Sequence, residues 1–107
     1  MATLKNKLDA VGIVNNEDSM IHKKLTIVND LGLHARAAAK LVGCASRYGC
    51  KIDLIHNQRR VDGKSILGVM TLGASKGTEL EVIIEGDEET AALQAIEALI
   101  NDGFGEN

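Results

Sequence analysis

The feature that most constrains the fold of this chain is that its strand-like and helix-like segments are each apolar on one side only. In residues 79–85, Leu80, Val82 and Ile84 point one way and glutamates point the other, which is the two-residue period of a half-buried strand. Residues 35–48 change to the helical period, with one apolar stripe opposite a polar face. Such elements bury their apolar sides against one another, which favours two packed layers.

Turn residues divide the chain into a series of such segments. We predict strands over residues 24–29, 51–56, 59–61 and 79–85, and helices over residues 35–48, 65–73 and 87–103. Ser65 and Asp87 are the expected N-caps of the second and third helices. The order βαββαβα predicts an α+β fold in which one mostly antiparallel sheet is covered on one face by the helices.

The first part of the chain differs from the rest. We assign residues 1–22 to an N-terminal extension that precedes a domain over residues 23–107. Leu4, Leu8 and Val11 have the spacing of an amphipathic helix that is too short to be stable alone. Two interpretations stay open: residues 1–19 are a true extension, or translation starts at Met20.

Composition limits the class of protein. The 107 residues suffice for one compact domain, and 45% hydrophobic residues with a net charge of -3 are typical of a globular protein rather than a disordered one. Aromatic residues make up only 2%, so we expect an aliphatic core and no nucleic-acid partner. Because the chain has neither a secretory signal nor a long apolar span, we predict a cytoplasmic protein with no membrane partner and reduced thiols.

The chain has few candidates for bound-group chemistry. Its three histidines are not spaced as metal ligands, and its two cysteines do not form a CxxC pair. Residues 62–65 read DGKS but lack the upstream glycine of a phosphate-binding loop. We therefore predict no metal and no cofactor, and find no site for phosphoenolpyruvate or ATP.

His34 differs from the other histidines because it directly precedes the first predicted helix. Backbone N–H groups in a first helical turn have no internal partners, and the helix dipole favours an anion there. One interpretation makes His34 a capping or packing residue. The other makes it a nucleophile whose phosphorylated form is stabilised by these N–H groups and by Arg36. Arg36 is otherwise a solvated surface charge, and composition does not separate the two interpretations.

Ser65 also has two interpretations, because a serine at a helix start is either an N-cap or a site where added phosphate is locally favourable. The short helix that follows has Ile66, Val69 and Met70 as its apolar positions. Ile66 and Leu67 are adjacent, so both cannot face the core, and we expect Leu67 at the surface. It is there either a docking contact or a single exposed apolar side chain.

Two long motifs resemble one family. LGLHARAAAKLV (residues 31–42) resembles the active-site segment of HPr, the histidine-containing phosphocarrier of the bacterial phosphoenolpyruvate:sugar phosphotransferase system. GKSILGVMTLGASKGTELEV (residues 63–82) resembles the regulatory serine segment of that family. The resemblance covers about residues 23–101. It implies an open-faced β-sandwich, with a four-stranded antiparallel sheet covered on one side by three helices.

The resemblance also implies roles for individual residues. His34 would accept a phosphoryl group on Nδ1 from enzyme I and pass it to an EIIA-type protein, with Arg36 stabilising the phosphate. Ser65 would be the target of an HPr kinase/phosphorylase. The surface that meets partner proteins would comprise Ala39, Lys40, Ile66, Leu67 and Met70. The protein would be a monomeric carrier rather than an enzyme.

One residue departs from the family motif, because Ala37 stands where proline is usual. Proline in a first helical turn costs little and alanine is a strong helix former, so we predict that His34 remains phosphorylatable. Two other hypotheses stay beside sugar transport. One is a regulatory adaptor of a nitrogen-type or incomplete phosphotransferase branch. The other is a binding domain that has lost the chemistry, against which the presence of both His34 and Arg36 argues.

Overall fold

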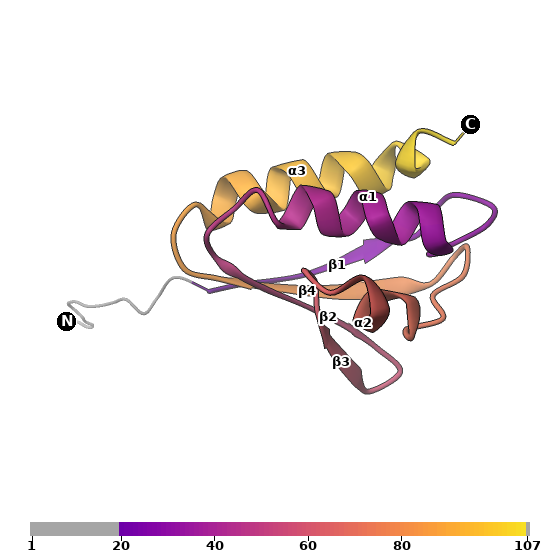
Figure 1. Ribbon diagram of the computed structural model, residues 1–107, viewed down its shortest axis with the longest axis horizontal. Helices are drawn as coiled ribbons and strands as arrows, with labels where there is room; N and C mark the ends of the chain where they lie inside the picture. The colour runs from indigo at the N-terminus through magenta and orange to yellow at the C-terminus, as the bar shows by residue number, and fades with distance from the viewer. Residues whose placement is uncertain (1–19, 107) are drawn as a thin grey trace.

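The computed structural model describes residues 20–106, and its order of strands and helices is the predicted βαββαβα (Figure 1). A short 3₁₀ helix, η1, follows the last α-helix. The predicted N-terminal helix around Leu4, Leu8 and Val11 lies outside the described residues. The elements are β1 (Met20–Thr26), α1 (Ala35–Ala45), β2 (Lys51–His56), β3 (Arg59–Asp62), α2 (Ile66–Met70), β4 (Glu79–Glu85), α3 (Glu89–Asn101) and η1 (Gly103–Gly105).

The four strands form one sheet in the order β1-β4-β2-β3, and every neighbouring pair is antiparallel. Helices α1 and α3 lie side by side over the sheet (Figure 1), and α2 packs against α1 and β3. The predicted α+β open-faced β-sandwich is therefore confirmed. Among residues 20–106, no helix is long and apolar enough to cross a membrane.

The core lies between the sheet and the helices and is aliphatic, as composition predicts. Alternate residues of the central strands, including Leu54, Val82 and Ile84, are fully buried against Ile96 and Ile100 of α3 and the rest of the core. Each large aliphatic side chain buried in this way stabilises the fold by about 1.5–3 kcal/mol. The only phenylalanine, Phe104, is buried too, and it fixes the C-terminal segment to the domain.

The opposite face of the sheet is mixed, with the half-buried Ile55 and Ile83 paired with charged and polar side chains of neighbouring strands. His22 Nε2 lies 2.6 Å from a carboxylate oxygen of Glu81, and Arg60 donates to Asp53 at 2.7 Å. The side chains of His22 and Arg60 are about half exposed, whereas Asp53 is buried. Ion pairs with an exposed partner contribute little to stability, so the helical layer supplies the main buried side of the sheet.

The first strand begins and ends earlier than predicted. Met20 pairs with Glu85 and Thr26 with Glu79, so residues 20–22 belong to the sheet rather than to the extension. The length of β4 explains this difference, because a long partner strand extends the pairing beyond the apolar pattern of residues 24–29. After Thr26, the backbone of Ile27 bonds only to the loop at residues 77 and 78.

All three helices are shorter than predicted. Helix α2 ends at Met70 rather than at residue 73, and α3 spans residues 89–101 rather than 87–103. Helix α1 ends at Ala45 rather than at residue 48, because Arg47 and Tyr48 bond back three residues in a tightened turn. The N-cap of α3 is Glu88, with a φ of 64° and no side-chain capping bond, rather than Asp87. A left-handed residue directly before the helix redirects the chain after Gly86, so Asp87 lies one residue too early to cap.

Candidate functional site

His34 is the N-cap of α1, as one of the two interpretations of the sequence expects. Its backbone is extended, with φ -73° and ψ 179°, and its Nδ1 accepts a hydrogen bond from the backbone N–H of Arg36 at 3.3 Å. The carbonyl oxygen of His34 accepts the first helical bond, from Ala38, at 2.8 Å. The ring thus lies at the positive end of the helix dipole with Nδ1 directed at the first turn.

The loop before His34 is fixed by close backbone packing. Gly32 has a φ of +65°, and a Cβ at this position would lie 2.5 Å from the carbonyl oxygen of Ala74. Only glycine is compatible with this approach. The neighbouring Leu33 is buried, and its N–H donates to the same oxygen at 2.9 Å. The LGLH segment therefore presents His34 from a rigid support.

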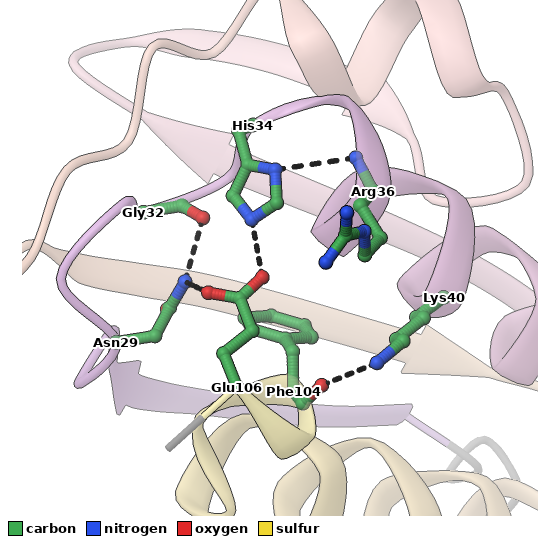
Figure 2. A network of polar contacts seen from close by, with 7 residues as sticks. All are labelled: Asn29, Gly32, His34, Arg36, Lys40, Phe104 and Glu106. Carbon is green, nitrogen blue, oxygen red and sulfur yellow. Dashed lines mark hydrogen bonds and ion pairs between the residues drawn. The ribbon is translucent and has the colours of Figure 1, made fainter.

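The C-terminal segment completes the site from the other side. Lys40 on α1 donates to the carbonyl oxygen of Phe104 at 2.6 Å, which ties η1 to the helix that His34 caps. The carboxylate of Glu106 then contacts His34 Nε2 with one oxygen (Figure 2). Its other oxygen accepts from Asn29 Nδ2 at 2.9 Å. The two nitrogens of the imidazole therefore have different partners.

Hydrogen bonding fixes the charge of Glu106. The Asn29 amide donates to the carboxylate and lowers the pKa of Glu106 below its ordinary value, and His34 and Lys40 add to this effect against the opposing effect of burial. An ionised carboxylate only accepts hydrogen bonds. In this geometry His34 Nε2 is therefore the donor and Nδ1 the acceptor.

Two cations face the same region. Arg36 and Lys40 line a cavity of about 450 Å³ together with Asp30, Leu31, Gly105 and Glu106. The guanidinium of Arg36 makes no ion pair with another described residue, so its donors are available to a phosphate. A larger cavity of about 840 Å³ between α1 and α3 includes, of the predicted site residues, only Lys40.

Ser65 is the N-cap of α2, and its Oγ accepts from the N–H of Gly68 at 3.1 Å. The expected capping role is therefore present. Ser65 and His34 begin two different helices that pack against each other, and neither side chain bonds to the other among the described contacts.

The surface of α2 is more apolar than predicted. Leu67 is 79% exposed, as expected, but Ile66 and Met70 are also more than two-fifths exposed, and only Val69 is buried. The expectation that only Leu67 of the adjacent pair Ile66 and Leu67 lies at the surface is therefore wrong, because Ile66 is exposed too. Because α2 has only five residues, a single position can reach the core. Ala39 and Lys40 are exposed on the neighbouring α1.

Sequence reasoning missed Asn29 and Glu106. The sequence predicts Asn29 only as the residue where the first strand meets the turn, and it predicts no role for the residues after Gly103. Their separation of 77 residues gives no local pattern that predicts their contact. Within residues 20–106, no group of three His, Cys, Asp or Glu side chains is arranged to hold a metal ion.

Comparisons with known proteins agree with this architecture. Residues 21–102 match the family model described as the PTS HPr component phosphorylation site. The phosphocarrier protein HPr of Pseudomonas aeruginosa is 54% identical over 84 residues, which cover 78% of this chain and 93% of the relative. That of Treponema pallidum is 47% identical over 87 residues, which cover 81% and 99%.

A solved structure supports the same assignment. The crystal structure of HPr-C-His from Thermoanaerobacter tengcongensis superposes with a TM-score of 0.78 at 39% identity, covering 81% of this chain and 98% of the other. Fold and relatives together define a phosphocarrier protein, which carries a phosphoryl group and is not an enzyme. The chain belongs to the HPr family of the phosphotransferase system.

Proposed function

We propose that this protein accepts a phosphoryl group from enzyme I on Nδ1 of His34 and passes it to an EIIA-type protein. The observation that supports this most strongly is the position of Nδ1, which accepts from the Arg36 N–H at the start of α1. The lone pair is thus at the end of a helix where free N–H groups stabilise an incoming anion.

In the proposed transfer, the Nδ1 lone pair attacks phosphorus while the donor nitrogen or oxygen leaves with its electron pair. Arg36 stabilises the equatorial phosphate oxygens, where charge is concentrated in such transition states. The helix dipole contributes only about 0.3–1 kcal/mol at an exposed position. This modest stabilisation suits a carrier, because a phosphoryl group held more strongly would not be passed on.

We propose that partners dock on the surface formed by Ala39 and Lys40 of α1 and by Ile66, Leu67 and Met70 of α2. The support is the exposure of three large apolar side chains on one short helix beside the helix that His34 caps. We expect the carrier to act as a monomer in the cytoplasm. Cys44 and Cys50, which are buried and unpaired, fit a reducing compartment.

Ser65 is the proposed regulatory site, modified by an HPr kinase/phosphorylase. Phosphate on Ser65 would add about -1.5 to -2 charges next to the apolar surface of α2. Because desolvating such a charge in an apolar interface is unfavourable, the modification would weaken the binding of enzyme I.

The test is transfer of ³²P from phosphoenolpyruvate through enzyme I. Wild-type protein should acquire an acid-labile label, His34→Ala should acquire none, and Ser65→Ala should be labelled normally. Arg36→Ala should be labelled at least about tenfold more slowly, the order expected for loss of one transition-state donor, whereas Arg59→Ala on β3 should be unaffected. An unlabelled wild type, or a labelled His34→Ala, would refute the proposal.

A further inference from the structure

A groove of about 840 Å³ runs between α1 and α3. We propose that residues 4–11 of the same chain bind in this groove as a short amphipathic helix, with Leu4, Leu8 and Val11 directed into it. The inference concerns a segment outside residues 21–102, which match the family model, and it does not depend on the proposed phosphoryl transfer. The small and apolar residues that line the groove are Gly43, Cys44, Ala95, Ala98 and Leu99.

The groove has room for aliphatic side chains because small residues line both of its walls. A Cβ added at Gly43 would meet no atom of a neighbouring element within 4 Å. On the other wall Ala98 is exposed, and Ala95 and Leu99 are half-buried. Apolar surface in a groove between two helices is suited to a third helix that places its own apolar stripe there. Leu4, Leu8 and Val11 have the spacing of such a stripe.

The start of β1 lies within reach of the groove. Met20 pairs with the last residue of β4, and α3 starts four residues after that partner, so β1 and α3 begin at the same end of the molecule (Figure 1). Ala95 is six residues along α3 from its start at Glu89, or about 9 Å at the rise of a helix. The eight residues between Val11 and Met20 span roughly 25 Å when extended, which is more than this path requires.

The length of the segment matches the length of the groove. The backbone N–H of Gly49, just after α1, donates to the side chain of Glu88 at 3.4 Å, so α1 ends where α3 begins. Leu4 and Val11 are seven residues apart, as are the groove residues Lys40 and Arg47, which is about 10 Å along a helix. A segment that enters from the start of β1 therefore extends to the Lys40 end of the groove.

Charge supports the same direction of the segment. Arg47 is exposed where the segment would enter, and its guanidinium makes no ion pair with another described residue. Asp9 lies between Leu8 and Val11 in sequence, so a helix bound in this direction brings its carboxylate to the same end. An exposed pair of this kind adds little affinity, but it favours one direction over the other.

The covalent link to β1 makes weak contacts sufficient. A helix of this length is unstable alone, so its stability has to come from burying the apolar stripe. A short linker supplies an effective concentration in the mM range, so even a low intrinsic affinity keeps the segment bound. Because Lys40 lines both this groove and the cavity beside His34, the first residues of the chain would then lie next to the proposed phosphorylation site.

NMR spectroscopy of the full chain tests the proposal with three variants. Leu8→Asp places a charge on the apolar stripe, and Asn6→Asp, the matched control, places the same charge on the opposite side of the predicted helix. Gly43→Leu fills the groove at a position where a side chain has room. The measurements are nuclear Overhauser effects (NOEs) from the methyl groups of residues 4–11 and amide chemical shifts of the groove residues, each at two protein concentrations.

In wild type and Asn6→Asp, we expect NOEs from the Leu4 and Leu8 methyl groups to Gly43 and Ala98, unchanged on dilution. In Leu8→Asp and Gly43→Leu these NOEs should be lost. In Leu8→Asp the groove amides should also shift, while the amides of β2 and β4 stay in place, which shows that the domain remains folded. Substituted residues in the segment lie outside the described fold, so the loss of NOEs does not depend on unfolding.

A charge reversal tests the direction of the segment. Arg47→Glu should weaken the NOEs, and Asp9→Arg in the same chain should restore them.

The absence of these NOEs in wild type would overturn the proposal, as would groove amides that Leu8→Asp leaves unshifted. NOEs that weaken on dilution would assign the groove to a second copy of the chain, and NOEs to β1 would place the segment at the sheet edge; both contradict the proposal. Because none of these measurements involves phosphate, a failed ³²P assay would refute the proposed function and leave this inference standing.

Discussion

At the scale of single residues, the geometry of the site depends on single atoms, such as a Cβ that must be absent or a ring nitrogen that has one particular partner. Gly32 is required because a Cβ would collide with Ala74 O, and His34 is useful because its two nitrogens have different partners. The sequence predicts both His34 and Arg36 as site residues, since a helix start and a family motif are local signals. The contact with Glu106 was not, because it joins residues that only the folded chain brings together.

Ala37 is the residue at which this chain departs from the usual family motif. It lies in the first turn of α1, where a backbone N–H has no partner within the helix, and it is fully buried. We predict that Ala37→Pro folds, keeps His34 phosphorylatable, and changes the free energy of unfolding by no more than about 1 kcal/mol. Urea denaturation measures the stability and ³²P transfer the function. Ala45→Pro in the last turn is the control and should destabilise strongly, by about 3 kcal/mol or more. A comparable loss in Ala37→Pro would contradict this view of the first turn.

At the scale of elements, the residues at which α2 and α3 begin, and the lengths of these helices, determine which side chains are exposed. Helix α2 has five residues and one buried side chain, so most of its apolar surface is exposed, and periodicity alone overestimated its burial. Helix α3 starts after a left-handed Glu88 rather than after a capping aspartate. By contrast, strands β2 and β4 begin and end where alternation predicts, because both are paired along their length.

Substitutions of Ser65 at the start of α2 can separate its contribution to helix capping from its effect on the docking of partner proteins. We predict that Ser65→Ala lowers the free energy of unfolding by about 1 kcal/mol, because it removes the acceptor for the Gly68 N–H. Ser65→Asp keeps an acceptor at this position and should retain that stability, yet it should slow phosphoryl transfer from enzyme I because it adds charge beside Leu67. Thermal unfolding and ³²P transfer on both variants measure the two effects. Equal transfer rates for Ser65→Asp and wild type would show that charge at this position does not oppose docking.

At the scale of the whole molecule, the two-layer architecture was predictable because it follows from which residues are apolar, and those residues recur at regular spacing. The site was only half predictable. Its N-terminal half lies in one continuous motif, whereas its C-terminal half depends on a buried Phe104 with a left-handed φ of 58° and on a turn that Lys40 holds. Nothing in the local pattern of residues 103–106 indicates that this turn returns Glu106 to the start of α1.

Because the C-terminal turn brings the Glu106 carboxylate to the start of α1, the stability of the folded protein depends on whether Glu106 is ionised, and therefore on pH. Its pKa is lowered in the folded protein, chiefly by the hydrogen bond from Asn29. The carboxylate therefore stabilises the folded state fully above its ordinary pKa of 4.5, and this contribution disappears as the pH falls through the lower folded value. We predict that wild type is more stable than Glu106→Gln at pH 5.5 and above, roughly one unit or more above the ordinary titration of a carboxylate. Below that ordinary value the difference should shrink.

Urea denaturation of both proteins across this pH range measures the difference directly. Glu97→Gln is the matched control, because its carboxylate pairs with an exposed Lys23 and such a pair contributes little. A difference between wild type and Glu106→Gln that grows as the solution is acidified would mean that the carboxylate is bound more weakly than Asn29 and His34 together imply. A difference that shrinks would tie the stability of the C-terminal turn to the same hydrogen bonds that orient His34.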